Sequence, residues 1–427
     1  MPYQHSTPPL RRAAPLAAAL FAALLLAACG GGGGSSSDSA PAASAGSDGA
    51  TGTGTGSGTG SGTDAGSGTG TGTSGSGSDT GTGTDNGSGS TPTPTPTSYD
   101  WSALATRLDA SVGSDSGQVA GYSFAVAVSS STASNSRYTR GGGNLASTAR
   151  VALASASKGP TALLVLSLVR DGLLDLDMPV VNYLGSDISW PAAKSAITLR
   201  MLLDHTSGIP YSSACLSDTA STLAACTQEI ADTALVFPPG TRFGYSGAGY
   251  QVVGYVAQQV SGVAWNTLFR QRIGTPLGSG LSWGDSTQNP RIAGGAVAST
   301  DDYVKLLQML LDGGLAADGT TRLLDAAQVQ SLQRSEIDGL PVYYTPAPAS
   351  AGLHGYSLGW WITDTASHPG SAGPELSNPG LLGSLPWVDF DRRYAAVLLT
   401  NSDTDTATSI WGALRPLILD QVNAVPN

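Results

Sequence analysis

The residues from Gly30 to Ser98 are the feature that most constrains what this chain can fold into. Nearly all of them are Gly, Ser, Thr, Ala, Pro or Asp, and the tract contains no aromatic residue, Val, Leu, Ile or Met. Such a tract cannot bury enough apolar surface to offset the entropy lost on ordering. We therefore expect residues 29–98 to form a disordered tether, and residues 99–427 to form one folded domain.

The first 28 residues have the pattern of an export signal. Arg11 and Arg12 precede an apolar stretch from Ala13 to Ala28, which is shorter than the ~20 residues that a membrane-spanning helix needs. The end of this stretch, Leu26 to Cys29, resembles the lipobox of bacterial lipoproteins, in which a signal is cleaved before a cysteine that is then lipidated. The resemblance predicts a lipid bilayer as partner through an acyl anchor on Cys29 and, because Gly30 is not acidic, an outer-membrane destination. An ordinary signal peptide with an incidental cysteine is the alternative.

Charge and cysteine usage narrow the functional classes. The net charge is -11 and no cluster of Lys or Arg occurs, so we expect no nucleic-acid partner. In an exported protein Cys215 and Cys226 would lie in an oxidising compartment, where a disulfide persists. A metal site is the weaker reading, because two thiols without a nearby histidine lack the usual ligand set. We expect a short-loop disulfide, no metal site and no cofactor.

The spacing of apolar residues predicts the elements of the folded domain. Helical spacing predicts helices over residues 101–112, 158–171, 198–203, 219–235, 248–260, 301–311 and 406–422, with Ser299 or Thr300 as N-cap of the sixth. Alternation predicts strands over residues 122–128, 356–363, 385–390 and 394–400. Strands at both ends with helices between them predict an α/β (α+β) sandwich. One antiparallel sheet would form from distant segments, flanked by the terminal helices, with an all-helical insertion.

Ser155 and Lys158 form the most informative local motif. If they open the helix that follows, they are i and i+3 neighbours on one helix face. A serine hydroxyl becomes a good nucleophile when a base removes its proton, and a lysine can do so when burial or nearby cations lower its pKa. The helix N-terminus would also stabilise a developing oxyanion. The four-residue motif alone is weak evidence, because a serine three residues before one of the chain's lysines arises often by chance.

The sequence around this motif resembles the serine β-lactamase and penicillin-binding protein superfamily. More narrowly, it resembles the class C β-lactamase, D,D-peptidase and family VIII esterase branch. The matching segments occur in the same order as in that branch, at residues 155–184, 197–208, 239–246, 293–295 and 356–361. It implies a β-lactamase-like sandwich and a reaction through an acyl-enzyme. It also implies that Ser155 is the nucleophile, Lys158 its general base, and Tyr245 the second-motif tyrosine that moves protons.

Two departures from the family pattern bear on the substrate. The second motif, Tyr-x-Asn in lactamases and peptidases, is Tyr245-Ser246-Gly247 here, so the amide that would bind a substrate carboxamide is missing. The third motif has two candidates, His368-Pro369-Gly370 and Asn378-Pro379-Gly380, and the residues that follow favour Asn378. The resemblance then assigns Gly380 and the N–H of Leu381, with that of Ser155, to the oxyanion hole. It places no cation where lactamases hold a substrate carboxylate, which favours neutral esters or amides.

Two further candidates have structural alternatives. We interpret Trp360 and Trp361 as one packed ring and one that lines the cleft, with Trp361 as the candidate for substrate contact, although a core role for both is an equal alternative. His205 lies in a segment that resembles a conserved turn of the family, so we interpret it as a turn or core histidine. No Gly-x-Ser-x-Gly pentapeptide surrounds Ser155, which argues against a Ser-His-Asp hydrolase.

The sequence therefore predicts a membrane-tethered serine hydrolase that forms an acyl-enzyme on Ser155. Its partner would be a small-molecule ester or amide, with a carboxylesterase-like activity preferred. A D,D-peptidase or β-lactamase is the alternative within the enzymes. A non-catalytic lipoprotein that binds the cell wall is the alternative outside them, motivated by the missing asparagine.

Overall fold

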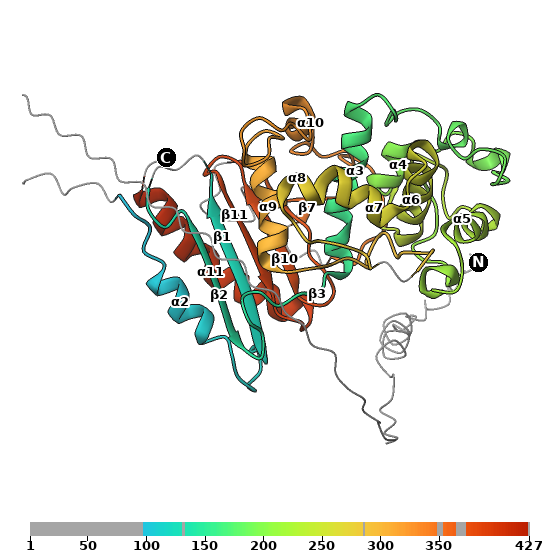
Figure 1. Cartoon of the computed structure of the whole chain (residues 1–427). Helices are drawn as coiled ribbons and strands as arrows, with labels where there is room; N and C mark the ends of the chain where they lie inside the picture. The colour runs from blue at the N-terminus through green and yellow to red at the C-terminus, as the bar shows by residue number, and fades with distance from the viewer. Residues whose placement is uncertain (1–96, 130–132, 285–286, 348–352, 364–372, 426–427) are drawn as a thin grey trace, which may run out of the picture. The chain divides into compact units, whose positions relative to one another are not determined.

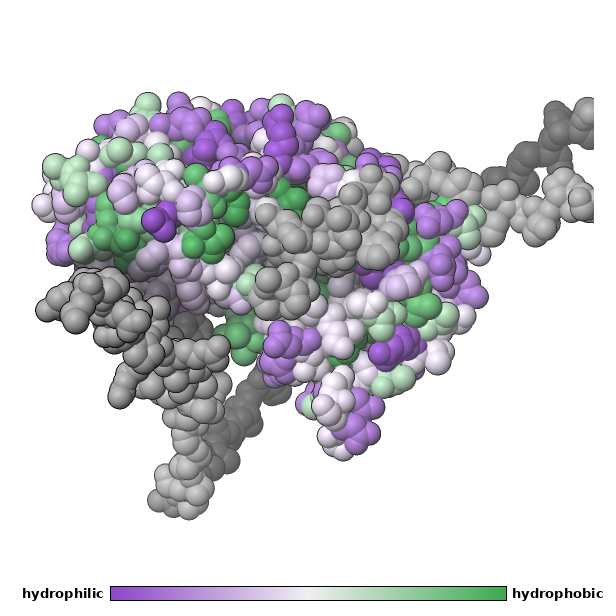
Figure 2. Space-filling view, turned by 180° about the vertical axis from the view of Figure 1, so that it is seen from behind, coloured by the Kyte–Doolittle hydropathy of each residue, from purple (hydrophilic) through white to green (hydrophobic). Residues whose placement is uncertain are grey.

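The computed structural model describes residues 97–129, 133–284, 287–347, 353–363 and 373–425. The predictions for residues 1–96, which include Cys29, and for His368 lie outside the described residues. Within these ranges, no helix combines the length and the apolar character needed to cross a bilayer. The face shown in Figure 2 carries hydrophilic and hydrophobic residues side by side, as protein surfaces generally do.

A seven-stranded sheet brings the two ends of the folded chain together (Figure 1). Its strand order is β2-β1-β11-β10-β9-β8-β7, with antiparallel pairing between the neighbours. The bounds are β2 Arg137–Gly143, β1 Gly121–Val128, β11 Tyr394–Leu399, β10 Ser384–Asp389, β9 Glu375–Ser377, β8 Trp361–Thr363 and β7 Leu353–Tyr356. Within the described residues, the first strand, β1, thus pairs with the last, β11, which confirms the predicted antiparallel sheet of distant segments.

Helices cover both faces of this sheet, as Figure 1 shows. α2 (Ser102–Asp109) and α11 (Thr404–Ala424) share one apolar cluster with alternate residues of β1, β10 and β11. α9 (Thr300–Leu311) packs against β1 and β11 within the other cluster. That second cluster also contains the helical insertion, whose helices are α3 Lys158–Arg170, α4 Leu199–Leu203, α5 Leu223–Asp232, α6 Gly247–Ser261, α7 Trp265–Phe269 and α8 Thr275–Leu277. The predicted terminal helices and helical insertion are therefore confirmed.

Two short strand pairs and a disulfide fasten the segments around the insertion. β3 (Val151–Ala152) pairs with β5 (Val297–Ala298), and β4 (Phe243–Gly244) pairs with β6 (Val342–Tyr344). These pairs were not predicted, because strands of two or three residues leave no alternating pattern in the sequence. Cys215 and Cys226 form the predicted disulfide, which connects the turn at Ala214–Ser217 to α5.

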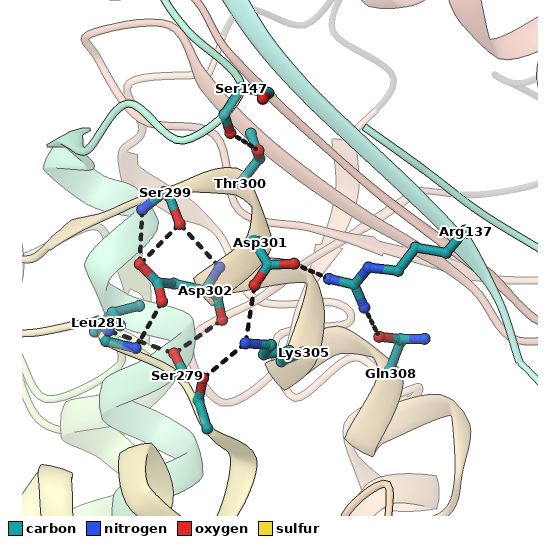
Figure 3. A network of polar contacts seen from close by, with 12 residues as sticks. Arg137, Ser147, Ser279, Leu281, Ser299, Thr300, Asp301, Asp302, Lys305 and Gln308 are labelled. Carbon is teal, nitrogen blue, oxygen red and sulfur yellow. Dashed lines mark hydrogen bonds and ion pairs between the residues drawn. The ribbon is translucent and has the colours of Figure 1, made fainter. Parts of the chain in front are cut away.

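The start of α9 is fixed by a network of polar contacts (Figure 3). Ser299, one of the two predicted N-caps, accepts the N–H of Asp302 at 3.1 Å, and the Asp302 carboxylate accepts the N–H of Ser299 at 3.0 Å. This reciprocal pair is a capping box, which satisfies two donors that the helix itself leaves unbonded. Asp301 forms ion pairs with Lys305 and with Arg137 of β2. The network therefore fixes the start of α9 against β2, the edge strand of the sheet.

The predicted strand over residues 356–363 is wrong. β7 ends at Tyr356, β8 begins at Trp361, and the two strands pair with each other as a hairpin. Gly359 in the turn has a φ of +81°, and a Cβ there would lie 2.8 Å from the backbone oxygen of Lys158. The turn therefore requires glycine both for its backbone conformation and for its close approach to α3.

Candidate active site

Ser155 lies in a 3₁₀ turn, Ala154–Ser157, that runs directly into α3. Ala154, the residue before it, has a φ of +46°, a left-handed conformation that is costly for a residue with a Cβ and that is often found at functional sites. Ser157 stabilises this turn, because its hydroxyl donates to the backbone oxygen of Ala154 at 2.7 Å and accepts the N–H of Ala296 at 3.0 Å. The strained backbone beside Ser155 is thus held by contacts on both sides.

Lys158 is the first residue of α3, and its side chain reaches back to Ser155 as the i, i+3 spacing predicts. Its Nζ donates to Ser155 Oγ at 3.3 Å and to the backbone oxygen of Ala293 at 3.1 Å. Only 2% of Lys158 is exposed. Burial, together with the positive charge of Arg291, lowers the pKa of Lys158 to about 7. Near neutral pH a large fraction of Lys158 is therefore uncharged and able to accept a proton.

Tyr245 completes a group of three side chains around Ser155. It follows β4, and its N–H donates to the backbone oxygen of Tyr344 in β6 at 3.0 Å. The side chain of Tyr245 lies beside Ser155, whose hydroxyl acts to lower the pKa of the phenol, and the Nζ of Lys158 lies 4.5 Å from the centre of the Tyr245 ring. Burial raises the pKa of Tyr245 well above its usual value, and the neighbouring Ser155 hydroxyl only partly opposes this effect. Tyr245 is therefore a neutral phenol that can donate a proton.

Buried aromatic side chains hold Tyr245 in place. Trp361 stacks on its ring with 5.7 Å between centroids and 13° between planes, and the His205 ring lies 4.3 Å away. Trp361 is only 6% exposed, so it supports Tyr245 more than it forms an open wall of the site. Trp360 is fully buried, and a Cβ at Gly159 would lie 2.5 Å from its ring. The pair is thus one packed ring and one ring beside the site.

His205 has the structural position that the sequence indicated. It is buried, it has a φ of +66°, and its Nδ1 accepts the N–H of Ser246 at 3.1 Å. The proton of the neutral ring then lies on Nε2, which is 3.1 Å from the hydroxyl of Tyr356. Burial, reinforced by the charge of Lys158, lowers the pKa of His205 well below its usual value. His205 is thus a neutral ring that packs against Tyr245 and accepts a hydrogen bond from the backbone N–H of Ser246.

The segment from Asn378 to Leu381 lies directly against the Ser155 turn. A Cβ at Gly380 would lie 2.1 Å from the backbone oxygen of Leu153, so only glycine fits this approach. The N–H of Gly380 donates to Ser384 at 2.7 Å, and it is therefore already occupied. Asn378 is buried, and its side-chain amide donates to the backbone oxygen of Gly359 at 2.8 Å. The placement agrees with the third motif, while the use of the Leu381 N–H in an oxyanion hole stays a prediction.

The sequence reasoning missed Tyr303, which supports the Ser155 turn from α9. The hydroxyl of Tyr303 donates to the backbone oxygen of Ala156 at 2.8 Å. Four residues after Ala156 the chain has Pro160, which lacks the N–H that a helix would direct at this oxygen. Pro160 was the available signal, because it leaves a buried oxygen in need of a donor, but nothing in the sequence identifies which distant residue provides that donor.

The sequence reasoning also missed Arg291. It lies two residues before Ala293, whose backbone oxygen accepts from Lys158, and its charge contributes to the low pKa of that lysine. No local pattern distinguishes this arginine from the others in the chain. Among the described residues, no group of three or more His, Cys, Asp or Glu side chains is arranged to hold a metal ion.

Comparison with known proteins relates this geometry to a family. The family model described as Beta-lactamase matches residues 103–415. The penicillin-binding protein 4 of Amycolatopsis lactamdurans is 29% identical over 312 residues, which cover 64% of this chain and 79% of that protein. A crystal structure of a putative beta-lactamase from Bacteroides dorei superposes with a TM-score of 0.63 at 26% identity, covering 76% of this chain and 100% of the other. EstCE1, a hydrolase with promiscuous acyltransferase activity, shares the fold with a TM-score of 0.61 at 20% identity, covering 75% and 98%.

Proposed function

Because the chain belongs to the beta-lactamase family of serine hydrolases, we propose that it hydrolyses an ester or amide through an acyl-enzyme on Ser155. The observation that carries this proposal is the hydrogen bond from Lys158 Nζ to Ser155 Oγ, with the Tyr245 ring 4.5 Å from that Nζ. A buried lysine of low pKa and a neutral phenol are the acid–base pair that such a reaction needs. The contacts support these roles, and activity measurements test them.

In the proposed acylation, Ser155 attacks the substrate carbonyl while neutral Lys158 takes the hydroxyl proton. The negative charge that develops on the carbonyl oxygen is stabilised by the N–H groups of Ser155 and Leu381. Tyr245 then donates its proton to the leaving group, and the Lys158 ammonium restores that proton to Tyr245. In deacylation a water molecule attacks the acyl-enzyme, the same groups accept its proton, and Ser155 regains its hydrogen as the acid is released.

We favour an ester over a β-lactam or a peptide as substrate. Gly247 occupies the place of the asparagine in the second motif, and a Cβ there would make ordinary contacts of 3.5 Å with Leu216 and 3.7 Å with Ala293. This position therefore accepts a Cβ without a clash but offers no amide to bind a carboxamide. The relative named penicillin-binding protein 4 supports the second candidate, a D,D-peptidase or β-lactamase.

We also propose that the enzyme is anchored to the outer membrane. This proposal rests on the lipobox-like segment that ends at Cys29 and on the tether that follows it. In cells that make the full chain, Cys29→Ala should move the protein from the detergent-soluble membrane fraction to the soluble fraction or stop its maturation. Unchanged fractionation and unchanged mature mass would remove the support for the anchor.

A fluorophosphonate probe tests the nucleophile directly. The purified wild-type protein should be labelled, and Ser155→Ala should abolish the labelling, while Ser102→Ala on the exposed side of α2 should leave it unchanged. Persistent labelling of the Ser155→Ala variant would place the nucleophile elsewhere. An unlabelled wild type with a normal circular dichroism spectrum would favour a non-catalytic binding protein.

A substrate panel separates the enzyme classes. We expect short-chain nitrophenyl esters to be turned over faster than a chromogenic cephalosporin or a peptide ending in D-Ala-D-Ala. Tyr245→Phe should slow ester turnover without preventing folding, because it removes only the hydroxyl. Rapid turnover of the cephalosporin alone would refute the preference for esters and support the β-lactamase alternative.

A further inference from the structure

Arg291 is an exposed cation without a partner in the described part of the chain. Its side chain forms no hydrogen bond or ion pair with any described residue. Most other arginines do form ion pairs, namely Arg137, Arg140, Arg150, Arg170, Arg200, Arg272, Arg392, Arg393 and Arg415. The chain carries a net charge of -11, so carboxylates are abundant. Arg107, Arg242 and Arg334 have no ion pair among the described residues either, so Arg291 is distinguished by its position and not by the missing partner alone.

The position of Arg291 is next to the Ser155 turn. A Cβ at Gly294 would lie 3.5 Å from Arg291 Nε and 3.8 Å from the backbone carbonyl carbon of Ala154. Arg291 and the residue before Ser155 thus both lie within van der Waals contact of the Cβ position of Gly294. The positive charge of Arg291 also helps to lower the pKa of Lys158. The contacts around Gly294 therefore place the Arg291 side chain beside the Ser155 turn, and the effect of its charge on Lys158 agrees with that position.

No described carboxylate neutralises this guanidinium. Desolvation lowers the pKa of Arg291, and no described acidic group opposes that effect. The nearest charged group of the site, Lys158, has the same sign when protonated. An anion that entered the site would give Arg291 an ion-pair partner. It would also reduce the repulsion between Arg291 and protonated Lys158.

We propose that Arg291 binds an anionic group of the substrate, so that the preferred ester or amide carries a carboxylate close to its scissile bond. A guanidinium presents a planar fork of N–H donors that matches a carboxylate with two parallel hydrogen bonds. In an acidic protein a local cation also offsets the repulsion that an anionic substrate meets. This proposal rests on the proposed hydrolase function of Ser155. It revises the expectation of a neutral substrate, which considered only the third motif.

A second role for Arg291 would be to lower the pKa of Lys158 and nothing else. The two roles predict different kinetics. Tuning of Lys158 affects every substrate alike, because all of them use the same base. Recognition affects only substrates that carry the anion. The ratio of kcat/KM for an anionic ester to kcat/KM for its neutral counterpart therefore isolates recognition.

The experiment uses the full chain and two matched pairs of aryl esters. One pair carries the charge on the acyl side, nitrophenyl hydrogen adipate against nitrophenyl hexanoate. The other carries it on the leaving group, 4-acetoxybenzoate against its methyl ester. Arg291→Gln should lower the anionic-to-neutral ratio in one pair by roughly tenfold or more, because a charge-assisted hydrogen bond is lost. Arg107→Gln on α2, across the sheet from the site, should leave both ratios unchanged.

Arg291→Lys keeps the positive charge but loses the planar pair of N–H donors that the guanidinium presents. We expect its ratio to lie between those of the wild type and Arg291→Gln, and this variant decides the matter if Arg291→Gln does not fold. Unchanged ratios in both pairs, with neutral esters still hydrolysed, would overturn the proposal for Arg291 alone. A wild type that hydrolyses none of the four esters would overturn the hydrolase proposal, and this inference with it.

Discussion

The hydrogen bond from Tyr303 to Ala156 gives the sharpest test of how the Ser155 turn is held. Tyr303→Phe keeps the buried ring and removes only the hydroxyl that donates to the Ala156 oxygen at 2.8 Å. Because Pro160 has no N–H, that oxygen is then left without a donor in a buried position. Leaving a buried acceptor unsatisfied costs about 1–3 kcal/mol, so we expect the free energy of unfolding to fall by this amount.

Pro160→Ala supplies a matched background for this test. With an alanine at position 160 the helix can direct its own N–H at the Ala156 oxygen, which makes the Tyr303 hydroxyl redundant. Tyr303→Phe should then cost well under about 1 kcal/mol, so the two substitutions should show a coupling energy of at least about 1 kcal/mol. The intrinsic effect of replacing proline, about 0.4–1 kcal/mol through the unfolded chain, cancels in the cycle.

Urea unfolding of the wild type, the two single variants and the double variant measures this coupling. The rate of fluorophosphonate labelling gives a second readout, because a loosened turn moves the hydroxyl of Ser155 away from Lys158. Tyr303→Phe should slow labelling, and the double variant should recover it in part. If Tyr303→Phe lowers the free energy of unfolding equally with proline and with alanine at position 160, the idea that Tyr303 replaces the N–H that Pro160 lacks is refuted.

Three further predictions follow from the site and its surroundings. The kcat/KM for a neutral ester should rise with pH through an inflection near 7, because Lys158 must lose its proton, and its pKa is lowered to about 7; an inflection near the ordinary lysine value would contradict this. His205→Leu should be less stable than His205→Asn by at least about 1 kcal/mol in urea unfolding, since asparagine tolerates a positive φ and leucine does not. Equal stability would show that the backbone there relaxes freely. Alkylation should modify Cys215 and Cys226 in the purified protein only after reduction, and modification without reductant would argue against the disulfide.

Local patterns were sufficient for β1, β10 and β11 of the sheet and for the contact within one helical turn, but they did not predict β2 or β9. The alternation over residues 122–128 and 394–400 predicted two strands that the structure pairs, and the spacing of Ser155 and Lys158 predicted their contact. Such features depend on neighbours in the sequence, so periodicity reports them directly. The predicted strand over residues 356–363 failed because Gly359, with its left-handed φ, turns a run of apolar residues into a hairpin.

Long-range contacts were beyond the sequence. Tyr303 reaches Ala156 from α9, and Arg291 reaches the site from a loop, across sequence separations that no local period encodes. The tilt of Trp361 onto Tyr245 likewise depends on how β8 meets β4. For such contacts the sequence can indicate a need, as Pro160 does, but only the fold identifies the residue that meets it.

The pairing of β1 with β11 has a consequence for synthesis on the ribosome. β1 cannot acquire β11 as its neighbour until residues 394–399 have been made and have left the exit tunnel. Pairings between segments so far apart in sequence form slowly, and the chain meanwhile exposes unpaired strand edges. The Gly380 segment that closes against the Ser155 turn is also made late. A nascent or truncated chain that lacks these segments therefore contains the serine and the lysine without the arrangement around them, and the site is assembled only after residues 394–399 have been made.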